Sequence, residues 1–174
     1  MSNYKVFAVA GLGRIGINIA RELLSIQKGD HGRIEAVHLL TQSASKLSNE
    51  IRAELIGEGA HLHTVNYTSP TSVSDALQGV DVLISAIGYR GLSSQEALCD
   101  RAKEARVKLF VPSEYGARSD DMKDPLFAIK ELFRQKLIAN GIKFAAFYSG
   151  FWADFDLDPY VLVPSSINVA KLQY

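Results

Sequence analysis

Residues 6–16 read Val6-Phe7-Ala8-Val9-Ala10-Gly11-Leu12-Gly13-Arg14-Ile15-Gly16, an apolar run that gives way to glycines. Apolar residues then recur through residues 17–24 with the spacing of one helix face, so the stretch predicts a buried strand, a tight turn and an amphipathic helix. The three glycines stand in G-x-G-x-x-G spacing, which permits close backbone approach to a pyrophosphate and close packing of helix on strand. Glycines also end strands for structural reasons alone, but their place between strand and helix favours a dinucleotide site.

The start of the predicted helix is the part of this turn that would meet phosphate. N–H groups without a helical partner lie there, and the helix dipole makes this end positive. We therefore expect the cofactor to be contacted by Gly11, Gly13, Arg14, Ile15 and Gly16.

Short apolar runs alternate with amphipathic segments through nearly the whole chain. Further strands are expected at residues 34–40, 62–65, 80–86, 107–111 and 142–148, and helices at 14–27, 45–58, 94–106 and 126–140. Ser72 or Ser74 is expected to cap one more helix, which ends at Gly79. This alternation predicts a doubly wound parallel sheet of the α/β class, a Rossmann-like NAD(P)-binding fold.

Composition narrows the class of protein. The 174 residues suffice for one domain with a sizeable core, and 19 basic and 19 acidic side chains cancel, which argues against a nucleic-acid or anionic-membrane partner. The single cysteine, Cys99, excludes an internal disulfide framework and offers no cysteine pair for zinc, so we expect no metal site. Residues 1–5 lead directly into the first strand without a leader, and no apolar run has membrane-spanning length, so we expect a cytoplasmic protein.

Ligands of such a sheet bind beyond the carboxyl ends of its strands. After the second strand stand Thr41, Gln42, Ser43 and Lys46, with no acidic residue to bind an adenine-ribose 2′-hydroxyl. These side chains, together with Arg14, suit a 2′-phosphate, so NADP (NADPH) is favoured over NAD. The alternative is that Arg14 and Lys46 are ordinary solvated charges at helix starts.

The exits of the fourth and fifth strands supply further candidates. Three residues suited to close backbone approach follow the fourth strand, although they are equally typical of a plain loop: Ala86, Ile87 and Gly88. After the fifth strand, residues 112–116 place a hydroxyl, a carboxylate and a phenol at the mouth of the crevice, from Ser113, Glu114 and Tyr115. Glu114 is a candidate catalytic acid, or it merely caps or pairs locally.

Several segments together resemble a known family. Residues 11–16, residues 81–88, Gln95 and the phrase Lys108-Leu109-Phe110-Val111-Pro112-Ser113-Glu114-Tyr115-Gly116 look like the NmrA-like and isoflavone-reductase-like proteins. These are atypical members of the short-chain dehydrogenase/reductase superfamily. The resemblance covers about residues 4–155, and residues 110–116 are its most specific part.

The resemblance implies an NADP-dependent reductase in which the cofactor gives hydride to a small unsaturated or carbonyl compound. Residues 127–134, followed by Gly141-Ile142-Lys143-Phe144, are similar to the segment that carries the family's general acid/base, which here is Lys130. Ser113 and Tyr115 are then expected to line the nicotinamide end. A lysine buried beside a cofactor has a lowered pKa, as proton transfer requires. The Tyr-x-x-x-Lys pair common in the superfamily is absent.

Members of this family are substantially longer and build their substrate pocket from the C-terminal portion. We therefore expect residues 1–150 to be the NAD(P)-binding domain and residues 151–174 to begin a truncated substrate-binding portion, or to form an apolar tail. Two alternatives remain open: an NADP-sensing regulatory module without catalysis, and an inactive truncated fragment. The expected partners are a small-molecule substrate and, because the tail is apolar, a second copy or a regulatory protein.

Overall fold

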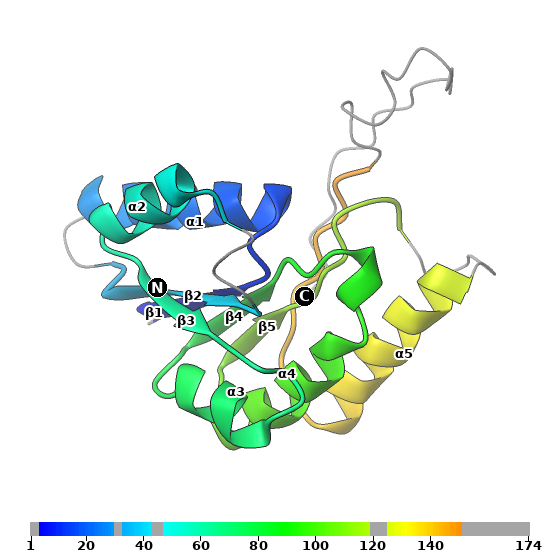
Figure 1. Cartoon of the computed structure of the whole chain (residues 1–174). Coiled ribbons are helices and arrows are strands. Elements are labelled where there is room, and N and C mark those ends of the chain that lie inside the picture. Colours follow the sequence, from blue (N-terminus) through cyan, green and yellow to red (C-terminus); the bar gives the residue numbers. More distant parts are fainter. Residues whose placement is uncertain (1–3, 30–32, 43–46, 119–124, 151–174) are drawn as a thin grey trace, which may run out of the picture.

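The computed structural model describes residues 4–29, 33–42, 47–118 and 125–150 (Figure 1). In chain order its elements are β1 (Val6–Ala10), α1 (Arg14–Gly29), β2 (Ala36–Thr41), α2 (Asn49–Gly57), β3 (His61–Thr64), α3 (Pro70–Ala76), β4 (Val82–Ser85), the 3₁₀ turn η2 (Tyr89–Gly91), α4 (Ser94–Glu104), β5 (Leu109–Val111) and α5 (Pro125–Ala139). The expectations for Ser43, Lys46 and residues 151–174 fall outside the described residues.

The strands form one parallel sheet in the order β3-β2-β1-β4-β5. The chain builds outward from β1 through β2 to β3, then returns to the other side of β1 and builds outward through β4 to β5. The predicted doubly wound parallel sheet is confirmed. Its strand order reverses between β1 and β4, and in such sheets this switch point is where ligands bind.

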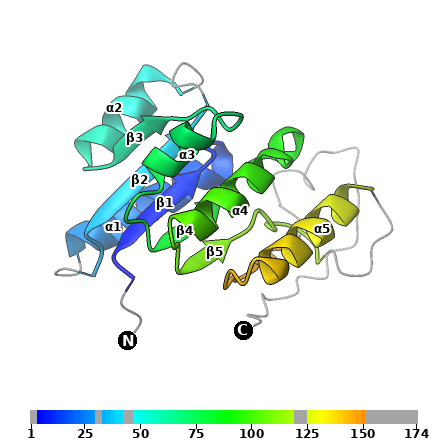
Figure 2. The same cartoon turned by 90° about the horizontal axis from the view of Figure 1, so that it is seen from below.

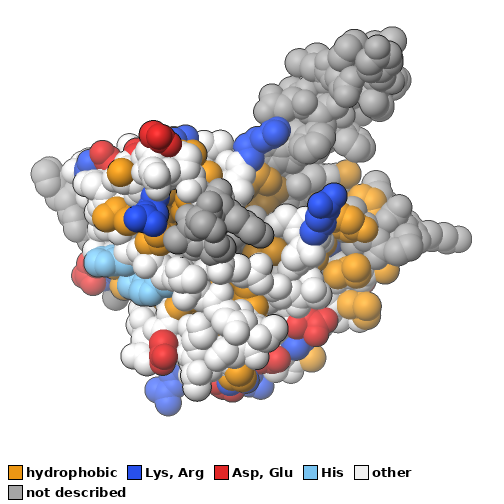
Figure 3. Space-filling model, viewed as in Figure 1, with side chains coloured by type: hydrophobic (Ala, Val, Ile, Leu, Met, Phe, Trp, Pro, Cys, Tyr) orange, Lys and Arg blue, Asp and Glu red, His pale blue; other side chains and the backbone are white. Residues whose placement is uncertain are grey.

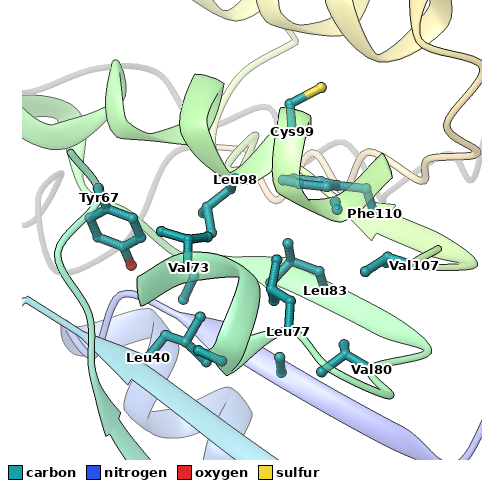
Figure 4. Close-up of a cluster of buried hydrophobic side chains, with 14 of the residues drawn as sticks. Leu40, Tyr67, Val73, Leu77, Val80, Leu83, Leu98, Cys99, Val107 and Phe110 are labelled. Atoms are coloured by element: carbon teal, nitrogen blue, oxygen red, sulfur yellow. The ribbon is translucent and has the colours of Figure 1, made fainter. Parts of the chain in front are cut away.

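Helices cover both faces of the sheet, with α1 and α2 on one face and α3, α4 and α5 on the other (Figure 1, Figure 2). Because successive strand residues point to opposite faces, Val82 and Ile84 of β4 join one core and Leu83 joins the other. The core beneath α3, α4 and α5 includes Leu40, Val73, Leu77, Leu83, Leu98 and Phe110 (Figure 4). Strands buried on both faces explain the continuous apolar runs of the sequence.

The sixth strand, predicted at residues 142–148, is reduced to a single bridge between Phe110 and Phe144. Phe110 donates its N–H to the carbonyl of Lys143 at 2.9 Å and accepts from the N–H of Ala145 at 3.0 Å. The prediction of a full strand was wrong because β5 offers too short a partner. It spans three residues and is followed by Pro112, which has no N–H to continue a ladder.

Two predicted helix starts were also wrong. The helix expected from residue 45 begins at Asn49, because the Ser48 hydroxyl accepts the N–H of Ile51 and caps it there. The α3 helix begins at Pro70, since proline is well suited to the first helical position, whereas Ser72 accepts a hydrogen bond from the N–H of Asn66. Capping depends on which hydroxyl reaches an N–H group, and residue type alone does not decide this.

Arg106 ends α4 in the left-handed conformation, with φ 57°. The N–H of Val107 bonds to the carbonyl of Ala102, as the N–H of Ile142 bonds to that of Leu137 at the end of α5. At α5, however, the left-handed residue is Gly141, which has no Cβ to strain the turn. Arg106 is therefore a strained exception at a position where glycine is preferred.

We expect Arg106→Gly to raise the free energy of unfolding by about 0.5–1 kcal/mol, because it relieves the left-handed strain. Urea titration followed by circular dichroism measures the change. The matched control is Gly141→Ala, which introduces the strain at a site where an added Cβ meets nothing within 4 Å, and it should destabilise by a similar amount. Equal stability of Arg106→Gly and the wild type would contradict the prediction.

Three histidines lie together on β2 and β3. The ring of His38 stacks on those of His61 and His63, with centroids 5.1 and 5.0 Å apart, and its Nδ1 lies 2.8 Å from Nε2 of His63. Burial, with lesser effects of the neighbouring imidazoles, lowers the pKa of His38 and of His63 below 6.5. Within the described ranges, no group of three or more His, Cys, Asp or Glu side chains is placed to bind a metal ion.

This cluster predicts loss of stability in mild acid. A histidine whose pKa is lowered by folding binds its proton better when unfolded, so its stability contribution is complete above pH 6.5 and is lost as the pH falls below that value. The melting temperature should therefore drop by a few degrees between pH 7.5 and 5.5. The double variant His38→Gln/His63→Gln should remove most of that slope, and an unchanged slope would exclude the cluster as its cause.

The surface drawn in Figure 3 mixes basic and acidic side chains, and hydrophobic side chains gather where α5 lies. Leu132 and Ile138 on this helix are 65% and 66% exposed. Among the described residues, no helix has the length and apolar character that crossing a membrane requires.

Candidate functional site

The exits of β1 and β4 meet at the switch point of the sheet, where Ala10 pairs with Ser85. Gly11 follows β1 with φ +96°, and its N–H donates to the carbonyl of Leu40 at 2.9 Å. A Cβ on Gly11 would lie 2.8 Å from the carbonyl oxygen of Ala86, and a Cβ on Gly16 would lie 1.9 Å from that of Gly11. Both glycines are therefore required by the close packing of the turn itself.

Gly13 is different from these two. It is exposed, and a Cβ added to it would meet no heavy atom within 4 Å. The fold does not need glycine at this position, whereas a ligand that presses against the backbone would. The three glycines therefore separate into two that shape the turn and one that leaves room beside it.

The helix that follows has an N-terminus suited to an anion. The carbonyl of Gly13 accepts the N–H of Ile17 at 3.0 Å, which is the first hydrogen bond of the helix. The N–H groups of the residues before Ile17 therefore have no carbonyl one turn earlier in the helix to bond to. No acidic side chain stands in the first turn of α1. The first turn of α1 thus brings no carboxylate of its own to the positive end of the dipole, where a pyrophosphate is expected, and Arg14 and Ile15 stand in that turn.

The exit of β2 adjoins a cavity of about 250 Å³ at the carboxyl ends of β2 and β3. Gln42 lines it, together with Thr64, Val65, Asn66 and Ser72. Thr41 is buried, and its carbonyl accepts the N–H of Val65 at 2.8 Å, so it ties the two strand exits together. Of the residues predicted to bind a 2′-phosphate, Gln42 is thus at the cavity and Thr41 supports it.

The residues after β4 adjoin the glycine turn. Ala86 donates its N–H to the carbonyl of Ala10 at 2.7 Å, and it and Ile87 are buried, whereas Gly88 is exposed. Ala86 also forms the surface that excludes a side chain at Gly11. This segment therefore packs against the glycine turn, and Gly88 is its solvent-facing part.

Ser113 links the exit of β5 to that of β4. Its hydroxyl donates to the carbonyl of Ile87 at 2.9 Å, and its N–H donates to Oε1 of Gln95 at 2.9 Å. Gln95, on α4, is only 2% exposed. The residue type of Gln95 does not predict that its side chain would hold the loop after β5, although Gln95 was part of the family resemblance.

Tyr115 follows in the same loop and is partly buried. Burial raises the pKa of its phenol well above the ordinary 10.0. The phenol therefore stays protonated at neutral pH, and it is unsuited to act as a base there.

Glu114 receives two cations from α5. Its carboxylate is 1% exposed, with Oε1 2.7 Å from Nη1 of Arg134 and Oε2 3.8 Å from Nζ of Lys130. Lys130 and Arg134 stand one turn apart and so share a helix face, and Arg134 also pairs with Glu131. The local pairing considered for Glu114 is what the structure shows. Arg134 was not anticipated, and its only sequence signal is the i,i+4 spacing from Lys130.

Lys130 is itself largely buried, with 11% of its side chain exposed. Burial lowers the pKa of its amine, Glu114 raises it and Arg134 lowers it, and the net direction is downward. An amine of this kind releases its proton more readily than an ordinary lysine and can exchange it with a substrate oxygen. The tie between Ser113 and Ile87 places the loop that bears Glu114 next to the exit of β4.

Comparison with known proteins gives one family and a consistent set of relatives. The sequence profile of the NmrA-like family matches residues 2–169. The chain is 26% identical to phenylcoumaran benzylic ether reductase PT1 of Pinus taeda over 90% of this chain and 52% of that protein. It is 28% identical to isoflavone reductase homolog A622 of Nicotiana tabacum over 88% of this chain and 50% of that protein. The chain thus spans about half the length of the curated relatives it matches.

Solved structures agree on the architecture. The structure of AtPrR2 with NADP⁺ and (+)pinoresinol matches with a TM-score of 0.78 at 23% identity, over 95% of this chain and 55% of that one. A structure from the work on pinoresinol-lariciresinol and phenylcoumaran benzylic ether reductases matches with a TM-score of 0.75 at 26% identity, over 94% of this chain and 57% of that one.

Proposed function

The chain belongs to the NmrA-like family, and on that premise we propose that it binds NADPH at the switch point and forms the cofactor half of a reductase. The observation that carries the proposal is the arrangement at Gly13. It has open space beside it between two glycines that the fold requires, at the N-terminus of a helix without acidic residues in its first turn. Relatives that are reductases, and a neighbouring structure that contains NADP⁺, support the same ligand.

Each part of the cofactor has residues to meet it. The pyrophosphate would lie on residues 11–16, and the 2′-phosphate near Arg14 and Gln42, with Ser43 and Lys46, which follow Gln42 in the sequence, as further ligands. Ala86, Ile87 and Gly88 would line the path between the two ends, and Ser113 and Tyr115 the nicotinamide end. This assignment predicts selectivity for NADPH, because no acidic residue follows β2 to bind a free 2′-hydroxyl.

NADPH supplies a hydride when bound. The Lys130 amine would give its proton to the oxygen of a small unsaturated or carbonyl compound, which balances the hydride gained by carbon, and would then regain a proton from water. We propose that residues 1–150 form this cofactor domain and that residues 151–174 begin the portion that binds substrate. The buried free thiol of Cys99 suits a reducing compartment and supports a cytoplasmic location.

Calorimetric titration of the chain with NADPH and, separately, with NADH tests the proposal. We expect a single site that binds NADPH more tightly than NADH. Failure of a folded sample to bind either nucleotide would overturn the proposal, and preference for NADH would overturn the assignment of the 2′-phosphate site.

A binding module that senses NADPH and controls a partner without catalysis is the second candidate. The exposed apolar side chains Leu132 and Ile138 on α5 favour it, because exposed apolar surface suits a second copy or another protein. NADPH binding without turnover, together with association that Leu132→Ser weakens, would select this candidate over the reductase.

A further inference from the structure

Glu114 and Arg134 form a buried ion pair directly beside the proposed proton donor. We propose that this pair positions the Lys130 amine and controls its proton release, with Glu114 favouring the charged amine and Arg134 opposing it. The inference rests on the proposed function for its biological meaning, but its physical content concerns the free protein alone.

The two oxygens of Glu114 make unequal contacts. The 2.7 Å distance from Oε1 to Arg134 is that of a charge-assisted hydrogen bond, whereas the 3.8 Å from Oε2 to Lys130 exceeds hydrogen-bond length. Arg134 is thus the partner that neutralises the buried carboxylate, and Lys130 is attracted without being fixed by a short bond. A lysine held this way keeps the freedom to meet a substrate oxygen.

A tight turn fixes where the carboxylate stands. Glu114 donates its N–H to the carbonyl of Pro112 at 2.8 Å, and the intervening Ser113 is fastened by Gln95 and Ile87. These hydrogen bonds hold the loop independently of α5. Glu114 is therefore a fixed charge beside which Lys130 lies.

Charges of opposite sign act on the Lys130 amine. Glu114 comes from the exit of β5, and Arg134, which also pairs with Glu131, comes from α5 itself. Tyr148, from the segment that follows α5, acts on Arg134. Asp100 of α4 is paired with Lys136 further along the helix. Glu114 and Arg134 are thus buried charges of opposite sign in the surroundings of Lys130.

Opposite charges predict opposite effects when each is removed. Glu114→Gln keeps the shape and removes the negative charge, so the pKa of Lys130 should fall. Arg134→Gln removes the positive charge beside Lys130 and keeps the carboxylate of Glu114, so the pKa of Lys130 should rise. A pair that served only to fasten α5 to the sheet would not produce shifts of opposite sign.

Pulse acetylation of the protein without ligand, over a series of pH values, measures this directly. Acetic anhydride reacts with neutral amines, and mass spectrometry of proteolytic peptides gives the rate at each lysine. At pH 8 we expect Glu114→Gln to raise the rate at Lys130 by about tenfold and Arg134→Gln to lower it, with the pH midpoint moving accordingly. The exposed Lys28 and Lys143 provide internal references whose rates should not change.

The matched control is Glu131→Gln, which removes a carboxylate that pairs with Arg134 but is 40% exposed, so its effect on Lys130 should be small. Midpoints that move in the same direction for Glu114→Gln and Arg134→Gln, or do not move, would overturn the proposal. If either variant fails to fold by circular dichroism, Glu114→Asp replaces it: the carboxylate then withdraws from Lys130, and the midpoint should move down part of the way. An unmoved midpoint in Glu114→Asp would overturn the proposal as well.

No nucleotide or substrate enters this experiment. A protein that fails to bind NADPH yet shows the opposite shifts would contradict the proposed function and leave the role of the pair intact. A protein that binds NADPH but does not show the shifts would support the proposed cofactor and contradict the role of the Glu114–Arg134 pair.

Discussion

Gly13→Val should lower NADPH affinity by about a hundredfold or more and leave the fold intact. A valine side chain at residue 13 would occupy the open space beside the turn, where the pyrophosphate is expected to press against the backbone. Because nothing in the fold lies within 4 Å of the added Cβ, the free energy of unfolding should change by less than about 1 kcal/mol. Calorimetry with NADPH measures the first effect, and urea denaturation measures the second.

The contrast with a neighbouring glycine makes this prediction specific. Gly16→Ala would bring a Cβ within 1.9 Å of the Gly11 carbonyl oxygen, so that variant should lose stability, and binding only as a consequence. If Gly13→Val binds NADPH as the wild type does, the cofactor does not pass over residue 13. The glycine motif would then be only architectural.

Lys130→Met should reduce turnover by about a hundredfold or more without weakening NADPH binding. Methionine preserves the apolar stem of the buried side chain and removes only the amine that is proposed to give the proton. The fold should survive, because Glu114 retains its 2.7 Å bond to Arg134. Turnover is measured as NADPH oxidation, with pinoresinol as a trial acceptor, since a solved structure of similar fold is described with this compound.

Lys136→Met is the control for that variant. Lys136 lies on the same helix but pairs with Asp100 at 3.1 Å, so its loss should not affect turnover. Unchanged turnover in Lys130→Met would remove Lys130 from the mechanism. A wild-type protein that binds NADPH and reduces nothing would favour the regulatory module instead.

Local sequence was sufficient for the fold class. The alternation of apolar strands with amphipathic helices, and the glycines between β1 and α1, predict a doubly wound sheet, because each signal lies within a few consecutive residues. Predictions failed where a distant partner decides: the sixth strand was lost because β5 is short and followed by Pro112. The start of α3 was misplaced because Ser72 bonds to Asn66 across a loop.

The candidate site divides in the same way. Its place at the strand exits follows from the parallel sheet, and Lys130 was named only through the family resemblance, since a lysine on a helix is otherwise a surface charge. Apart from its i,i+4 spacing from Lys130, nothing in the sequence distinguishes the buried Arg134 from an exposed basic residue such as Lys28.

The sequence by itself therefore determined the order of the elements and the loop that would meet a dinucleotide. Only the tertiary structure decided that a side chain would fit at Gly13 but not at Gly11 or Gly16, and that Glu114 lies between two cations. The physical reason is the separation in sequence over which each interaction acts. Periodicity and turn chemistry act between neighbours in the chain, whereas burial and charge pairing depend on how α5 packs against the exit of β5.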